Sequence, residues 1–184
     1  MEGIDLLNES STVLVVVDVQ GKLAQIMLNK EQLIDNIVQL IQGCKLFDIP
    51  IIWMEQTPDK LGPTVPKIAA ELDDNVKIIK RTFSCCGEQE FCRVLEEINR
   101  QTVLICGIET HVCVYQTACD LLQKDYQVQV VTDAVASRNE ENKSVGLERI
   151  VAAGGLKTTV ELALFELQRK VDEKTFRELI KIIK

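Results

Sequence analysis

An aspartate, a lysine and a cysteine each follow a different apolar run of the chain, and together they could attack a carbonyl carbon. Asp18 comes directly after residues 13–17, and Lys80 comes directly after residues 76–79. Cys113 lies shortly beyond a third run. A carboxylate can take the thiol proton, an ammonium can hold the thiolate, and the thiolate can attack the carbonyl carbon. The three residue types therefore indicate nucleophilic catalysis by a cysteine.

The residues around Cys113 favour the charged form of its thiol. Gly107 permits a tight exit from the preceding run, and Thr110 can cap a new helix. Cys113 would then lie in the first helical turn, where unpaired N–H groups and the helix dipole stabilise an anion. The other six cysteines are interpreted as small buried apolar residues, which is the usual role of a cysteine. Adjacent Cys85 and Cys86 do not form the CxxC pattern of a thioredoxin-type redox site.

Each of these residues has an ordinary alternative when taken alone. Asp18 could cap a helix or a turn, Lys80 could be a solvated lysine at a strand end, and Cys113 could be buried packing. Residues 17–21 lack the GxGxxG pattern of a dinucleotide-binding turn. The acidic pair and phosphate-accepting aspartate of a receiver domain are also missing.

The elements that must position these residues alternate along the chain. Several apolar runs are continuous, which is typical of parallel strands covered on both faces. Strands are predicted at 13–17, 49–54, 76–79, 102–106, 128–132 and, more weakly, 156–159. Helices are predicted at 31–47, 88–99, 111–124, 140–153, 160–169 and 173–184. Three of the four prolines fall in a predicted loop at 57–66.

This alternation predicts an α/β fold, namely a three-layer α/β/α sandwich with a mostly parallel, about six-stranded Rossmann-like sheet. The length of 184 residues suits one domain spanning residues 1–184. Ligands of such sheets bind beyond the carboxyl ends of the strands. Asp18, Lys80 and Cys113 can therefore converge on one crevice.

The composition of the chain argues against several classes of binding partner. The net charge is −7, with 21 Lys and Arg against 28 Asp and Glu, and this opposes nucleic-acid binding. The apolar run at 13–17 is far too short to span a membrane, and we expect a cytoplasmic protein. A single histidine argues against a histidine-built metal site. We expect no cofactor and no metal.

Three segments in this order resemble the isochorismatase-like cysteine hydrolase superfamily: residues 14–20, 80–84 and 106–114. The resemblance covers about residues 11–167. Residues 55–58 and 61–66 also resemble the isochorismatase-domain-containing protein subgroup, whose substrates are mostly unassigned.

The resemblance implies a role for each residue of the set. Asp18 would be the general base and later proton donor, Lys80 would lower the thiol pKa, and Cys113 would be the nucleophile. The family has a cis peptide before its nucleophile, which corresponds here to Ile108–Glu109. The backbone N–H groups of Glu109 and Cys113 would form the oxyanion hole.

The chain also departs from named members of the superfamily. Nicotinamidases carry a metal site of an aspartate and histidines after the second strand, and residues 53–59 contain no histidine. Isochorismatases often lack the nucleophilic cysteine, which is present here. Candidate substrate-pocket residues are Gln20, Trp53, Gln56 and Phe83; core or interface packing is the alternative for the aromatic ones. His111 could contact substrate or lie at the surface.

The predicted activity is metal-independent hydrolysis of a C–N bond in a small amide or carbamoyl compound through a cysteine thioester. The alternative is an interaction or scaffold protein that keeps the fold with an idle set of catalytic residues. A weaker third hypothesis is a redox sensor that uses Cys113 as a sulfenate. The resemblance further implies a homo-oligomer, a dimer or larger, with the loop at 57–66 as a candidate contact edge.

Overall fold

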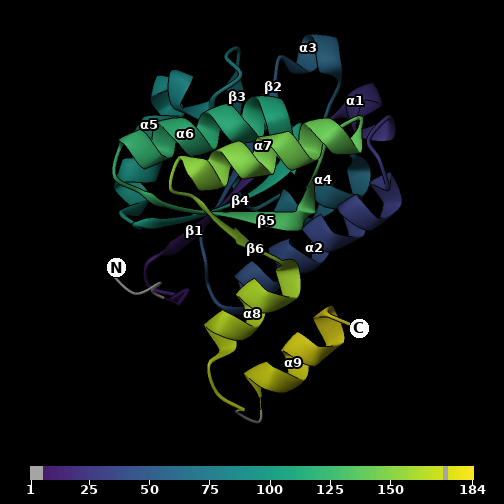
Figure 1. Ribbon diagram of the computed structural model, residues 1–184. Helices are drawn as coiled ribbons and strands as arrows, with labels where there is room; N and C mark the ends of the chain where they lie inside the picture. The colour runs from purple at the N-terminus through teal and green to yellow at the C-terminus, as the bar shows by residue number, and fades with distance from the viewer. Residues whose placement is uncertain (1–5, 172–173) are drawn as a thin grey trace.

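A parallel sheet of six strands forms the centre of the protein in the computed structural model, which describes residues 6–171 and 174–184. The strand order is β3-β2-β1-β4-β5-β6, and every neighbouring pair is parallel (Figure 1). The strands are β1 (Thr12–Val17), β2 (Ile51–Gln56), β3 (Val76–Lys80), β4 (Thr102–Ile108), β5 (Gln127–Ala136) and β6 (Leu156–Thr158). The predicted fold class is confirmed, including the weak sixth strand.

Helices cover both faces of this sheet. Those described are α1 (Gly21–Gln25), α2 (Lys30–Leu46), α3 (Pro58–Leu61), α4 (Pro66–Leu72), α5 (Gln89–Ile98), α6 (Tyr115–Gln123), α7 (Glu140–Ala152), α8 (Val160–Gln168) and α9 (Thr175–Ile182). Helices α5, α6 and α7 pack on one face, and α2, α4, α8 and α9 pack on the other (Figure 1). The sheet is therefore the middle layer of three.

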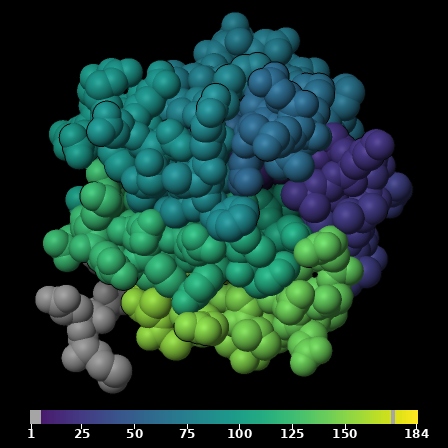
Figure 2. Space-filling view, turned by 90° about the horizontal axis from the view of Figure 1, so that it is seen from above, coloured from purple at the N-terminus to yellow at the C-terminus, as the bar shows by residue number. Residues whose placement is uncertain are grey.

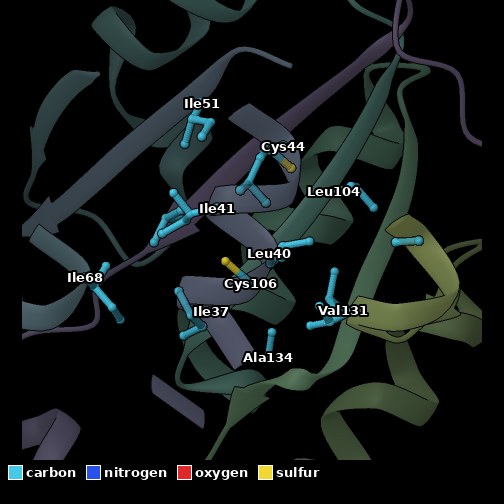
Figure 3. Close-up of a cluster of buried hydrophobic side chains, with 14 of the residues drawn as sticks. Ile37, Leu40, Ile41, Cys44, Ile51, Ile68, Leu104, Cys106, Val131 and Ala134 are labelled. Atoms are coloured by element: carbon cyan, nitrogen blue, oxygen red, sulfur yellow. The ribbon is translucent and has the colours of Figure 1, made fainter. Parts of the chain in front are cut away.

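The apolar residues of β1 explain why its sequence does not alternate with polar residues. Val13, Val15 and Val17 join the buried cluster beneath α5, α6 and α7. Leu14 and Val16 join the cluster on the α2 face. Each apolar side chain of this central strand is thus removed from water on one face or the other. Figure 3 shows the α2-face cluster, where Ile37, Leu40 and Ile41 pack against the sheet.

The cysteines divide differently from the prediction. Cys44, Cys85 and Cys106 are fully buried, as predicted, and Cys44 and Cys106 lie in the cluster of Figure 3. Three others, Cys86, Cys92 and Cys119, are only half-buried. The apolar interpretation therefore holds fully for three of the six cysteines outside the candidate site.

Several short helices were not predicted. The predicted loop at 57–66 contains α3, and α1 and α4 were missed. Both α3 and α4 begin with a proline at the first helical position, where its fixed φ favours a helix start. They are too short to show a helical hydrophobic period. The last predicted helix appears as α9, and its predicted first residue, Glu173, lies outside the described residues.

Candidate active site

The three residues of the predicted set meet at the carboxyl edge of the sheet. Asp18 follows β1, Lys80 is the last residue of β3, and Cys113 lies in a short π-helical turn (Thr110–Val114) after β4. Strand β2 lies between β1 and β3, and it ends at Gln56. Because the strands are parallel, all of their ends lie at the same edge of the sheet.

Asp18 and Lys80 form a buried ion pair. The Lys80 Nζ lies 2.7 Å from the Asp18 Oδ2, and the two side chains are 0% and 2% exposed. Burial raises the pKa of Asp18 to about 6, although Lys80 opposes this rise. Burial alone would lower the pKa of Lys80, but the Asp18 charge raises it above its ordinary value. At neutral pH the site therefore holds a carboxylate and an ammonium.

The Lys80 ammonium has further acceptors around it. It donates to the Oε1 of Gln56 and to the backbone carbonyls of Thr82 and Phe83, each at 2.9 Å. Buried ammonium groups are costly unless they are paired and hydrogen-bonded. The turn after β3 therefore supplies much of what keeps Lys80 charged inside the protein.

Cys113 lies next to this ion pair as a neutral thiol. Its Sγ donates to the Oε1 of Gln56 at 3.3 Å. Burial raises the pKa of the thiol to about 12; the Asp18 charge adds to the rise, and Lys80 opposes it. Lys80 does lower the pKa, as expected, but the net shift is upward. The sequence-based expectation of a thiolate stabilised at the helix start is wrong for the free protein, because burial outweighs that effect.

The turn that carries Cys113 leaves a backbone donor without a partner. The peptide bond between Ile108 and Glu109 is cis. The backbone N–H of Glu109 donates to no other described residue. The Oγ1 of Thr110 is also buried without a hydrogen-bond partner. This turn therefore offers unused polar groups beside the thiol, where an oxyanion could form.

Two contacts that sequence reasoning missed support the same turn from the end of β5. The backbone N–H and the Nε of Arg138 both donate to the Oε2 of Glu109 at 3.1 Å. The Nδ1 of His111 lies 2.9 Å from the Oγ of Ser137. Arg138 and Ser137 follow β5 directly. The strand predicted at 128–132 stops four residues before β5 ends at Ala136, so the rule that placed Asp18 and Lys80 at strand ends did not reach them.

The four candidate pocket residues have different surroundings. Gln56 contacts both Lys80 and Cys113, so it belongs to the site. Gln20 is fully buried and bonds to backbone groups. Trp53 packs in the α2-face cluster, and its Nε1 donates to Thr64. Phe83 is 54% exposed, and its backbone carbonyl accepts from Lys80.

Neither a metal cluster nor a membrane span is found in the part of the chain that the structure describes. No three His, Cys, Asp or Glu residues within it are grouped so that they could hold a metal ion. No helix within it is both long and apolar enough to cross a membrane.

Comparison with protein families and curated relatives identifies the class of the chain. The isochorismatase domain matches residues 12–161. A secreted isochorismatase effector of Phytophthora sojae is 39% identical over 95% of this chain and 85% of its own length. Isochorismatase domain-containing protein 2 of Danio rerio is 33% identical over 100% of this chain and 92% of its own length. The predicted resemblance, including the subgroup, is confirmed.

Solved structures share the fold along nearly the whole chain. A Caenorhabditis elegans structure described as MAR1 ribonuclease is 34% identical, with a TM-score of 0.91 over 97% of this chain and 92% of that one. The YcaC protein of Escherichia coli, described as an octameric hydrolase of unknown specificity, is 23% identical, with a TM-score of 0.93 over 99% of this chain and 92% of that one.

Proposed function

The chain belongs to the isochorismatase family, and we propose that it is a metal-independent cysteine hydrolase that cleaves the C–N bond of a small amide or carbamoyl compound. The observation that carries this proposal is the contact of Cys113 with Gln56, which also binds the ammonium of the buried Asp18–Lys80 pair. A nucleophile, a base and a fixed positive charge are thus gathered at the carboxyl edge of the sheet.

In the first half of the reaction, Asp18 takes the proton of the Cys113 thiol as the sulfur attacks the carbonyl carbon of the substrate. The negative charge that develops on the carbonyl oxygen is stabilised by the backbone N–H groups of Glu109 and Cys113. The tetrahedral intermediate then collapses, and protonated Asp18 gives its proton to the leaving nitrogen. This step releases an amine or ammonia and leaves a thioester on Cys113.

In the second half, Asp18 takes a proton from water as the water oxygen attacks the thioester carbonyl. Collapse of this second intermediate releases the acid, and the Cys113 sulfur recovers a proton from Asp18. One amide and one water give one acid and one amine, and the protein ends as it began. Lys80 keeps its charge throughout and holds Asp18 in place.

The test is to incubate the protein with a panel of small amides and N-carbamoyl compounds and to follow ammonia release. Acid quenching and mass spectrometry should find the acyl group on Cys113. Cys113→Ser should abolish turnover and the adduct, whereas Cys119→Ser, at a half-buried cysteine of α6, should change neither. Turnover that survives in Cys113→Ser contradicts the mechanism. If no compound is turned over and Cys113→Ala behaves as wild type in cells, the scaffold hypothesis replaces it.

The remaining expectations on partners stay part of the proposal. One relative is described as a ribonuclease. We favour a small molecule over RNA because the net charge of −7 opposes binding to a phosphate backbone. An octameric structural neighbour supports a homo-oligomer, which light scattering on the purified protein would test. A cytoplasmic location also remains a proposal, and one relative is named as secreted.

A further inference from the structure

Gln20 uses its side-chain amide on the backbone around the end of β2. It is fully buried, and its Nε2 donates to the carbonyls of Gln56 and Gly62, at 3.2 and 2.7 Å. Its Oε1 accepts from the backbone N–H of Gln56 at 2.6 Å. Both amide protons are therefore in use. Gln20 holds Gln56 by both of its backbone polar groups and has no donor left for a substrate.

The backbone of Gln20 also belongs to the turn that carries Asp18. Its N–H donates to the Asp18 carbonyl at 2.8 Å, and Asp18 has a left-handed φ of +50°. Close by, Gly21 contacts the end of α3, since a Cβ at Gly21 would lie only 1.9 Å from the Leu61 carbonyl oxygen. Helices α1 and α3 are in contact at the same end of the molecule (Figures 1 and 2). Gln20 thus joins the turn of the base to the segment after β2.

The side chain of Gln56 extends from this fixed backbone to the reacting groups. Its Oε1 receives one hydrogen bond from the Lys80 ammonium and another from the Cys113 thiol. Two donors at one oxygen fix the direction of the amide, because its NH₂ group could not accept either of them. The position of this oxygen therefore sets where the thiol proton points.

We propose that Gln20 is a positioning residue that acts through Gln56: it holds the backbone of Gln56 in place, so that the side-chain Oε1 of Gln56 keeps the Cys113 thiol protonated and oriented. This inference rests on the proposed function, since it concerns the same nucleophile. Gln20 was predicted from the sequence to be a pocket residue, and the hydrogen bonds give it this different task.

Loss of the Gln56 acceptor has a predictable chemical effect. A hydrogen bond donated by the thiol favours the neutral form, so its removal favours the thiolate. The Oε1 of Gln56 also accepts a hydrogen bond from the Lys80 ammonium. When this acceptor is removed, that N–H of Lys80 is free to point at the sulfur. Both changes act in the same direction. Loss of Gln56, or of the Gln20 side chain that holds it, should therefore make Cys113 more reactive toward an alkylating agent, although the site is less well ordered.

The test measures the second-order rate of Cys113 alkylation by iodoacetamide between pH 6 and 9, with peptide mass spectrometry to assign each cysteine. Gln20→Met and Gln56→Met should each raise the rate roughly threefold to tenfold, the change expected for a fall of about half to one unit in thiol pKa. The double variant should match Gln56→Met alone, because Gln20 acts through Gln56. Gln168→Met is the matched control: Gln168 is a buried glutamine whose Nε2 also donates to a backbone carbonyl, on α8.

The alkylation rate of Cys85 shows whether a variant affects Cys113 alone or destabilises the whole site. It is fully buried, and its thiol pKa is raised by burial and then by the Asp18 charge, so it lies near the same ion pair. Its labelling should stay at the wild-type rate. An unchanged Cys113 rate in Gln20→Met, additive effects in the double variant, or a parallel rise at Cys85 would each overturn the inference.

The proposed function fails separately, if no amide or carbamoyl compound is turned over and acid quenching finds no acyl group on Cys113; the alkylation rates measure the effect of Gln20 in either case. If Gln20→Met does not fold, Gln20→Glu takes its place. That variant keeps the acceptor for the Gln56 N–H but loses both donors. Its added charge acts equally on the protein with Gln56 and on the Gln56→Met variant, so the double-variant comparison is unaffected by it. Additivity there overturns the inference in the same way.

Discussion

The Lys80 ammonium lies 2.7 Å from the Asp18 carboxylate, and both side chains are buried from water. A pair of this kind is weak evidence for stability, because the desolvation of two charges offsets their attraction. Breaking it by removing one partner is different, since the other charge then remains buried and unpaired. The pair therefore couples the stability of the fold to the chemistry of the site.

Asp18→Asn should damage stability and activity together. The variant leaves the Lys80 charge with neutral acceptors only, at a cost of about 3 kcal/mol in the free energy of unfolding. Loss of the base should lower turnover by roughly 10³-fold. Asp35→Asn is the matched control, because Asp35 pairs with Lys67 on an exposed surface and its loss should cost under about 1 kcal/mol. Urea unfolding and ammonia release measure the two effects. Equal destabilisation by both variants would contradict the buried-pair argument.

The rate should depend on pH through the ionisation of Asp18. Burial raises the pKa of this carboxyl from 3.8 to about 6. Below that value Asp18 is protonated and cannot take the thiol proton, so kcat/KM should fall by about tenfold per pH unit. Above it the rate should level off. A profile from pH 4.5 to 9 tests this, and a midpoint near the ordinary value of an aspartate would show that Asp18 is not the essential base.

The sheet and its catalytic edge could be predicted from sequence because both follow from local patterns. Continuous apolar runs such as residues 13–17 report burial on two faces, and parallel strands end at one edge. The same rule brought Asp18 and Lys80 together. It missed the end of β5, where Arg138 binds Glu109, because the predicted strand stopped at residue 132 and β5 continues to Ala136.

The properties that depend on tertiary burial could not be predicted. The thiol pKa of Cys113 is decided by desolvation, which no local pattern shows. Gln20 and Gln56 looked alike as polar residues beyond strand ends, yet one binds backbone and the other binds the reacting groups. Only the packing of the segment after β2 against the β1 turn separates their roles.

Removal of metal ions should leave the activity unchanged. No group of His, Cys, Asp or Glu residues in the described ranges could hold a metal. The Lys80 ammonium already supplies a fixed positive charge near the thiol, since both donate to the Oε1 of Gln56. Dialysis against EDTA and 1,10-phenanthroline, with residual metal measured by mass spectrometry, should therefore give the untreated rate. A loss of rate that Zn²⁺ restores would show that a metal takes part.

Gly107→Ala should unfold or severely destabilise the protein through the contact between β4 and β1. Gly107 has φ +118°, and a Cβ there would lie 2.0 Å from the carbonyl oxygen of Val17. Gly154 is a matched control, with φ +105° and no atom within 4 Å of its added Cβ. Gly154→Ala therefore isolates the backbone strain, which costs about 1–2 kcal/mol in the free energy of unfolding. Gly107→Ala adds a backbone clash with Val17 that cannot relax without moving Asp18, the residue after Val17. This variant should lower the melting temperature far more or abolish soluble expression.

Thermal unfolding of the two variants side by side measures the difference. Similar melting temperatures would mean that the β1–β4 contact can widen, and that the turn before Cys113 does not depend on it.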